Sequence, residues 1–242
     1  MRCISQPAIR ALPFSLPPQS RVWVTRARPG ADRTGERVTA LGFAPVIAPL
    51  LAIRRLTARL DLAGVEALAF TSRNGVRVFV EQSQKRSLTI FAVGEATAAA
   101  AREAGFADVR SAGGDLHALA VLIRAQGAGL SVLHPCAAEP AGDLAALVGD
   151  AARITTLAIY EAVETATAAP ETWDAVLIHS PRAARALAAS VSPDVVQGRI
   201  ALAISPAAAA PLAALPFAEI RIARPPTEDA LLAALGKPQA SV

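Results

Sequence analysis

Apolar and polar positions follow two different periods along this chain. Residues 21–25 alternate as a strand does, and residues 29–41 then carry apolar positions at helical spacing, with Pro29 near the first turn. Gly42 is a suitable residue to end this helix, and residues 43–49 predict the next strand. Further along, short apolar strands keep alternating with helices of about ten to fifteen residues. The pattern predicts an α/β protein whose parallel sheets are covered by helices on both faces.

The same pattern occurs twice, at a spacing of roughly 110 residues. In each copy an apolar run ends in a small hydroxyl residue, and a helix, a second apolar run and an Ala-rich helix follow. The matched segments are 66–72 with 174–180, 90–94 with 200–205, and 105–109 with 216–220. The second copy is expected to begin with a strand over 130–134, a helix over 142–148 and a strand over 154–163. Two copies at so long a spacing indicate two similar lobes rather than a solenoid.

Charge is concentrated at the start of the chain. Residues 1–55 are rich in Arg and hold only Asp32 and Glu36 as acids, although the net charge of the whole chain is +4. A basic segment suits an anionic ligand, whether nucleic acid, phosphate or polycarboxylate. Aromatic residues make up only 4% of the chain, and no Lys-rich run or nucleic-acid-binding module is present. These features argue against a nucleic-acid partner.

Cysteine and histidine usage limits the chemistry further. Cys3 and Cys136 are too few for a disulfide framework, so a reducing, cytoplasmic location is expected. The three His have no short metal-ligand spacing, and no metal site is predicted. Because dinucleotide, phosphate-loop, nucleophile-elbow and zinc-protease motifs are all absent, no cofactor is predicted either.

Two segments could be mistaken for targeting or membrane sequences. Residues 200–218 carry no charge, but three prolines interrupt them, so we expect a buried strand, a turn and a helix rather than a membrane span. Residues 1–20 lack the apolar core of a secretory signal, and we expect a disordered tail or an upstream start codon there. No long apolar stripe is left for a partner, so a monomer is expected.

The expected strands end in small, hydroxylated or Arg-bearing loops. In parallel α/β sheets, ligands bind at these carboxyl ends, where the N–H groups of helix N-termini suit carboxylates or phosphates. Each candidate also has a purely structural interpretation: Ser72 as a helix cap, Arg26 as a surface charge, Tyr160 as strand packing. From the residues alone the chain is a two-lobed α/β protein with an anion-binding edge, and no reaction is named. The candidates at the strand ends are Arg26, Ser72, Arg73, Thr97 and Ser180.

A series of short motifs then resembles one known family. They are Val24-Thr-Arg-Ala-Arg-Pro29, Phe70-Thr-Ser-Arg-Asn-Gly-Val76, Ala92-Val-Gly-Glu-Ala-Thr97, Ile159-Tyr-Glu-Ala-Val163, His179-Ser-Pro181 and Pro226-Thr-Glu-Asp-Ala-Leu231. Their order and spacing together are similar to those of the uroporphyrinogen-III synthases, over residues 22–235. The chain departs from that family at Ala207 and Ala208, where relatives carry two threonines.

The resemblance implies a fold of two Rossmann-like, flavodoxin-like parallel-sheet lobes joined by a two-stranded β-ladder, with the active site in the cleft between them. The first lobe would be discontinuous, formed by residues 21–50 and 165–236. Residues 51–57 and 153–164 would be the linker strands, and residues 58–152 the second lobe. The repeat alone would have placed a boundary near residue 129.

The resemblance also implies a reaction. The family's substrate is the linear tetrapyrrole hydroxymethylbilane, which carries eight carboxylates and is closed to uroporphyrinogen III with inversion of the last ring and loss of water. Tyr160 would be the general acid, and the five strand-end candidates above would hold substrate carboxylates. The upstream deaminase would be a transient partner that hands over the substrate. The alternative from the residues is a non-catalytic two-lobed binding protein for a tetrapyrrole or another polycarboxylate.

Overall fold

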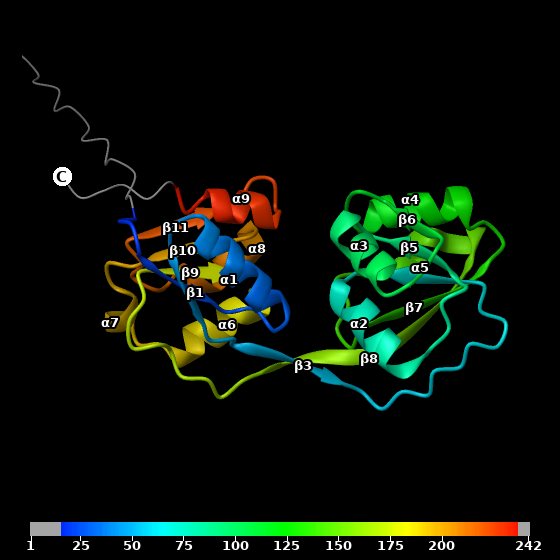
Figure 1. Cartoon of the computed structure of the whole chain (residues 1–242), viewed down its shortest axis with the longest axis horizontal. Coiled ribbons are helices and arrows are strands. Elements are labelled where there is room, and N and C mark those ends of the chain that lie inside the picture. Colours follow the sequence, from blue (N-terminus) through cyan, green and yellow to red (C-terminus); the bar gives the residue numbers. More distant parts are fainter. Residues whose placement is uncertain (1–15, 237–242) are drawn as a thin grey trace, which may run out of the picture. The chain divides into compact units, whose positions relative to one another are not determined.

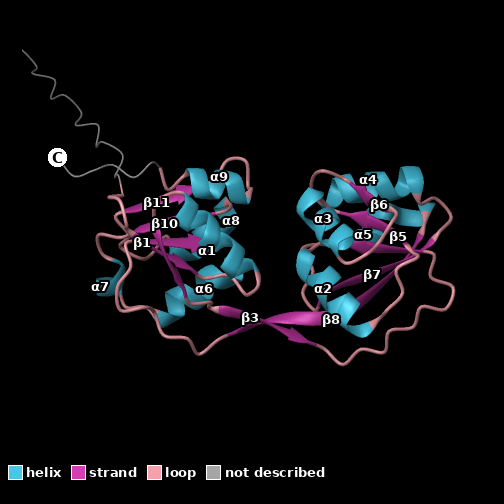
Figure 2. Cartoon of the chain, in the orientation of Figure 1, coloured by secondary structure: helices cyan, strands magenta, loops and turns pink. Residues whose placement is uncertain are grey.

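The computed structural model describes residues 16–236, and these form two compact units. The first unit contains the described residues up to Ala52 and those from Glu164 onward, and the second is Ile53–Val163. In each unit helices cover a mainly parallel sheet, with strands and helices alternating along the chain (Figures 1 and 2). Of the expected tail, residues 1–15 lie outside the described part of the chain, whereas Leu16 is buried in the core of the first unit.

The sheet of the first unit has five strands in the order β11-β10-β9-β1-β2, and each neighbouring pair is parallel. The order reverses between β1 and β9, which makes this pair the switch point where doubly wound folds bind ligands. The strands are β1 (Arg21–Val24), β2 (Ala44–Ile47), β9 (Ala175–Ile178), β10 (Ile200–Ala203) and β11 (Glu219–Ile222). The helices are α1 (Gly30–Ala40), α6 (Pro181–Ser190), α7 (Pro193–Val196), α8 (Pro206–Ala209), the 3-10 turn η2 (Ala210–Leu212) and α9 (Glu228–Ala233).

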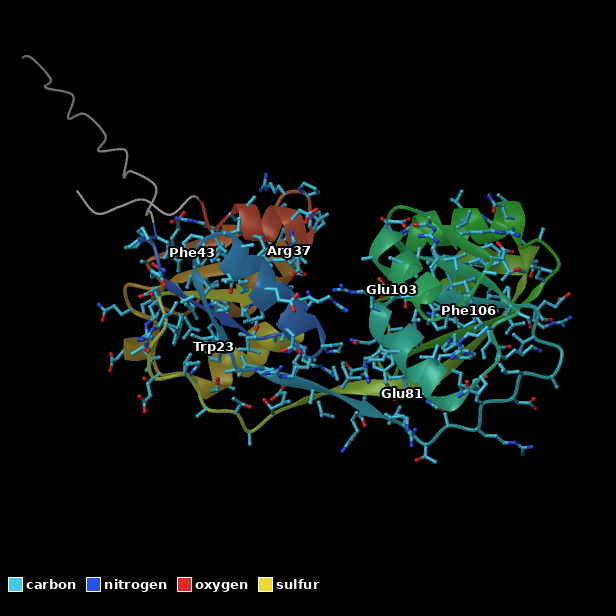
Figure 3. The ribbon with its side chains drawn as sticks, viewed as in Figure 1. Trp23, Arg37, Phe43, Glu81, Glu103 and Phe106 are labelled. Atoms are coloured by element: carbon cyan, nitrogen blue, oxygen red, sulfur yellow. The ribbon has the colours of Figure 1, made fainter. Side chains whose placement is uncertain are left out.

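Alternation along β1 divides the first unit's core into two layers. Val22 and Val24 point into the cluster that contains residues of α1 and α9, and Trp23 points into the cluster of α6 and α8. All three side chains are fully buried, because a central parallel strand has helices on both faces. Trp23 packs edge-to-face on Trp173 with 5.3 Å between the ring centroids, and Figure 3 labels it within this unit.

The second unit has a six-stranded sheet in the order β3-β8-β7-β4-β5-β6. Its switch point lies between β4 and β7, since β5 and β6 extend the sheet on one side of β4 and β7 and β8 on the other. The strands are β3 (Leu51–Arg55), β4 (Ala67–Phe70), β5 (Thr89–Ala92), β6 (Val109–Ser111), β7 (Ser131–Ala137) and β8 (Arg153–Glu164). The helices are α2 (Arg73–Gln82), α3 (Glu95–Glu103), α4 (Leu116–Gln126), α5 (Leu144–Val148) and the 3-10 turn η1 (Gly149–Ala151).

The repeat inferred from the sequence is confirmed as a structural repeat. The segment β4-α2-β5-α3-β6 of the second unit has the same order as β9-α6-β10-α8-β11 of the first, in which the short α7 and η2 are additional turns after α6 and α8. The registers agree as well, since β4 begins pairing with β5 at Ala67 and Thr89, and β9 with β10 at Ala175 and Ile200. Each copy therefore extends its sheet outward from a switch point by the same two steps.

The bounds of several elements differ in the structure from those expected from the sequence. The strand expected over residues 130–134 continues to Ala137 as β7, and the helix expected over 142–148 is the shorter α5. The apolar stretch 200–218 contains β10, α8 and η2, as its prolines predicted. Among the described residues, no helix has both the length and the apolar character to cross a membrane.

The second unit's core depends on Phe79 of α2. Its ring is fully buried and meets Phe70 edge-to-face at 5.7 Å and Phe106 at 6.2 Å between centroids. We expect Phe79→Ala to lower the free energy of unfolding of this unit by about 3–5 kcal/mol, because it leaves a cavity among aromatic rings. Urea unfolding followed by circular dichroism measures this loss. The control Val121→Ala removes an exposed side chain and should change stability by less than about 0.5 kcal/mol; equal effects of the two variants would contradict this packing.

Candidate functional site

In the second unit, the loop after β4 places Ser72 at the switch point. Ser72 is the N-cap of α2, and its Oγ accepts a hydrogen bond of 3.0 Å from the backbone N–H of Gly75. A Cβ on residue 75 would lie 3.0 Å from the carbonyl oxygen of Pro135 in β7, so glycine allows the first turn of α2 to approach β7 closely. The motif Ser-Arg-Asn-Gly thus builds a tight strand-to-helix turn at the end of the sheet.

Tyr160 of β8 reaches this turn. Its hydroxyl lies 2.7 Å from Ser72 Oγ, and its side chain is only 6% exposed. A bulge in the β7–β8 pairing sets its direction: Cys136 lies opposite Ala158, but the next residue, Ala137, lies opposite Tyr160. Ile159 is the extra residue, and both Ile159 and Tyr160 enter the same apolar cluster. The bulge therefore turns Tyr160 to the face on which Ser72 lies.

The Tyr160 phenol is held in its neutral form. Burial raises its pKa above the ordinary value, the hydrogen bond with Ser72 lowers it, and the nearby Cys136 thiol raises it again, with a net increase. Burial likewise raises the pKa of the Cys136 thiol. A neutral phenol with a hydroxyl partner can give a proton to a bound molecule, and the partner can then stabilise the phenolate.

His134 is a site residue that the sequence analysis did not select. It lies in β7, is 1% exposed, and its Nε2 is 3.2 Å from Thr71 Oγ1 in the loop before Ser72. Burial lowers its pKa to about 4, and the negative charge of Asp143 only partly opposes this, so the imidazole is neutral at physiological pH. The sequence signal for it was a histidine inside an apolar strand, which by itself indicates only a buried polar group.

The remaining candidates of this unit lie on the neighbouring strand ends. Arg73 is the first residue of α2, directly after Ser72. Thr97 lies in the first turn of α3, which follows β5, and is 5% exposed. Since β4 and β5 are adjacent, Ser72, Arg73 and Thr97 occupy one edge of the sheet together with the N-termini of α2 and α3.

In the first unit, the switch point is built from charged groups. Arg26 follows β1 and pairs through Nη1 with the half-buried carboxylate of Glu228 at the start of α9. Thr34 of α1 donates to the same carboxylate, and His179 Nε2 at the end of β9 lies 3.5 Å from it. Ser180, the next residue, caps α6 by accepting a hydrogen bond of 3.1 Å from the N–H of Ala183. Arg26 and Ser180 therefore end adjacent strands of one sheet, and Arg26 is already paired with a carboxylate.

Ala207 and Ala208, where the resemblance implies two threonines, lie in α8. Ser205 caps this helix by accepting a hydrogen bond of 3.3 Å from the N–H of Ala208. Ala207 is exposed and Ala208 is buried, so neither adds a polar group to this strand end. Within residues 16–236, no group of three or more His, Cys, Asp or Glu could hold a metal ion.

The Glu228 cluster predicts a pH-dependent contribution to stability. Burial opposes ionisation of Glu228, but the hydrogen bond and charge of His179, the charge of Arg26 and the Thr34 hydroxyl outweigh it and hold the carboxyl pKa far below its ordinary value of 4.5. Because the folded pKa is depressed, the stabilisation is complete above about pH 4.5 and is lost as the pH falls below it. We expect Glu228→Gln to lower the free energy of unfolding by roughly 1–2 kcal/mol at neutral pH and by less at pH 3. The effect is limited because Glu228 is partly exposed.

Denaturant unfolding at several pH values measures this difference. Glu103→Gln, an exposed position of α3, is the matched control and should leave the pH dependence unchanged. A difference between wild type and Glu228→Gln that stays constant from pH 7 to pH 3 would show that the carboxylate is not ionised within this cluster.

Comparisons with known proteins agree with this architecture. The crystal structure of uroporphyrinogen-III synthetase from Helicobacter pylori 26695 superposes with a TM-score of 0.64 at 19% identity, covering 89% of this chain and 97% of that one. A mutant uroporphyrinogen III synthase from the extremely thermophilic bacterium Thermus thermophilus gives a TM-score of 0.52 at 18% identity, covering 89% and 96%. At these identities the likeness shows the shared fold. No curated protein sequence matches the chain.

The family assignment rests on a match that spans most of the chain. The family described as uroporphyrinogen-III synthase HemD matches residues 32–233, which include the whole second unit and the repeated segments but begin after β1 and Arg26. This match favours the synthase over the binding-protein alternative. The chain belongs to the uroporphyrinogen-III synthase family, the hydro-lyases that act in tetrapyrrole biosynthesis.

Proposed function

We propose that Tyr160 is the proton donor with which this chain cyclises hydroxymethylbilane to uroporphyrinogen III. The observation that carries the proposal is the 2.7 Å contact between the Tyr160 hydroxyl and Ser72 Oγ at the switch point of the second unit. Ser72 Oγ already accepts the Gly75 N–H, so its own hydrogen is free to point at the phenol oxygen. In that arrangement the Tyr160 proton is directed away from Ser72 and toward a bound substrate.

The proton balance follows from this arrangement. Tyr160 protonates the terminal hydroxyl of the substrate, the C–O bond breaks with electrons supplied by the pyrrole nitrogen, and water leaves. The Ser72 hydroxyl would donate a hydrogen bond to the phenolate that remains, because a phenolate oxygen can only accept one. Attack by the last ring forms a spiro intermediate, which fragments and recloses with that ring inverted. The proton lost from carbon at the final closure restores the phenol.

Binding of the substrate is assigned to the strand ends. Arg73, Thr97 and the N–H groups at the start of α2 and α3 would hold carboxylates in the second unit, and Ser180 with the start of α6 would do so in the first. Arg26 would contribute a positive charge. Because its Nη1 already pairs with Glu228, its other guanidinium nitrogen atoms would contact the substrate. Holding the linear tetrapyrrole folded is the main task, because unguided closure gives the symmetric type I isomer.

Finer features of the family are proposed on the same basis. The β3–β8 pair would be the ladder that joins the two units, supported by the Arg54–Glu161 ion pair and the 2.9 Å bond from the Leu56 N–H to the Ile159 carbonyl. The boundaries between the units, after Ala52 and again after Val163, support a discontinuous first lobe. We further propose a cytoplasmic monomer that receives its substrate from the upstream deaminase.

The first test is the identity of the product. Hydroxymethylbilane is generated in place by its deaminase, this protein is added, and the oxidised porphyrins are separated by chromatography. We expect a large excess of type III over type I, and Tyr160→Phe should lower kcat by about 10²-fold or more while KM stays nearly unchanged. The neighbouring Ile159→Val serves as the control, since it changes packing only. Type I alone from folded wild-type protein would favour the binding-protein alternative, and an unchanged kcat in Tyr160→Phe would rule out the proton donor.

The carboxylate-binding role of Arg73 has a separate test. We expect Arg73→Gln to raise KM by roughly tenfold with little change in kcat, because one charge-assisted bond to substrate is lost. Arg77→Gln is the matched control, as Arg77 lies on the same helix and pairs with Glu81. Added salt should reduce the difference in KM between wild type and Arg73→Gln. If both variants show the same KM, Arg73 does not bind the substrate.

A further inference from the structure

Ser72 and Tyr160 come from strands that are not neighbours. The order β8-β7-β4 places β7 between the strand that carries Tyr160 and the strand that leads to Ser72. No ladder bond connects β4 with β8, so sheet pairing alone does not fix the 2.7 Å contact between the two hydroxyls. The contact depends on how the β4–α2 loop is held across the end of β7.

Two consecutive residues of β7 support that loop. Pro135 lies beneath the first turn of α2, where a Cβ on Gly75 would come within 3.0 Å of its carbonyl oxygen. His134 contacts the loop itself, with Nε2 at 3.2 Å from Thr71 Oγ1. Thr71 directly precedes Ser72, so a contact that holds Thr71 in place also limits the movement of the Ser72 backbone. His134 and Pro135 together form the support of the loop.

Burial and strand pairing hold His134 in a fixed position. Its side chain is 1% exposed, and β7 pairs with strands on both sides, at Leu133 with Leu68 of β4 and at His134 with Thr156 of β8. Among the described residues, Nδ1 has no hydrogen-bond partner, so the contact with Thr71 is the polar interaction that orients the ring. Depending on its tautomer, a neutral imidazole can accept a hydrogen bond from the Thr71 hydroxyl at Nε2 or donate one from Nε2 to the hydroxyl oxygen.

We propose that His134 is a positioning residue for the proton donor: through Thr71 it holds the β4–α2 loop where Ser72 Oγ meets the Tyr160 hydroxyl. The proposal rests on the proposed role of Tyr160, but the position of the loop can be measured apart from activity. Sequence reasoning would treat His134 as a buried polar residue of a strand, whereas this contact lets it influence the Tyr160 phenol through Thr71 and Ser72.

A spectroscopic readout follows because Tyr160 is the only tyrosine in the chain. The ultraviolet absorbance of phenolate therefore reports the ionisation of Tyr160 alone. Ser72→Ala should raise the Tyr160 pKa, since the Ser72 hydrogen bond lowers it. We expect His134→Leu to raise the Tyr160 pKa as well. His134→Gln, whose amide can reach Thr71, should keep the Tyr160 pKa close to the wild-type value. Val132→Ala, a buried residue of the same strand, is the control and should leave the titration unchanged.

Kinetics give the second readout. We expect His134→Leu to lower kcat by roughly 3- to 10-fold with KM nearly unchanged, because a loss of this size corresponds to the removal of one hydrogen bond. In a Tyr160→Phe background the same substitution should have little further effect, because its influence passes through the phenol. If His134→Leu does not fold, Thr71→Val removes the same hydrogen bond from the loop side and should give the same two results.

The outcomes separate this proposal from the proposed function. A Tyr160 titration that moves in Ser72→Ala but not in His134→Leu or Thr71→Val would overturn the positioning role. So would a loss of kcat in His134→Leu that is equally large in the Tyr160→Phe background, because that pattern indicates a general loss of structure. An unchanged kcat in Tyr160→Phe would instead refute the proton donor, and the titration would still test the contact.

Discussion

The constraint on which the rest of this structure depends is the covering of both faces of two parallel sheets. Because central strands such as β1 and β4 are buried on both faces, polar side chains such as Thr71 and Ser72 lie in the loops that follow these strands. Helix N-termini gather at the same edges and add unpaired N–H groups. Polar and charged groups such as Arg26 in the first unit and Ser72 in the second therefore lie beside the switch points of the two sheets.

The two copies of the repeat use the same turn for different purposes. Ser72 and Ser180 cap α2 and α6 with nearly the same extended backbone, and each is preceded by one loop residue, Thr71 or His179. In the second unit Thr71 meets neutral His134, and Ser72 meets a phenol, so these contacts join uncharged groups. In the first unit His179 meets Glu228, which also holds Arg26. The second unit's edge therefore joins uncharged polar groups, whereas the first unit's edge joins charged ones.

Ser72 is a helix cap whose hydroxyl also contacts the Tyr160 phenol. Its oxygen satisfies one of the N–H groups left unpaired at the start of α2, which fixes the side chain with little conformational freedom. The Ser72 hydroxyl also forms a hydrogen bond of 2.7 Å with the Tyr160 hydroxyl, and a bulge in β8 brings Tyr160 to this position. The same oxygen atom thus caps α2 and contacts the Tyr160 hydroxyl, so a substitution at Ser72 removes both interactions.

The sequence by itself determined the fold class, the repeat and the strand-end positions of Ser72, Arg73, Thr97, Ser180 and Arg26, because hydrophobic periodicity and cap residues are local properties. It did not show that Tyr160 meets Ser72, that His134 meets Thr71, or that Glu228 pairs with Arg26. Those partners lie 88, 63 and 202 residues apart. Only the tertiary structure decided them, since strand order and a one-residue bulge, which leave no periodic signal in the sequence, choose which side chains share an edge.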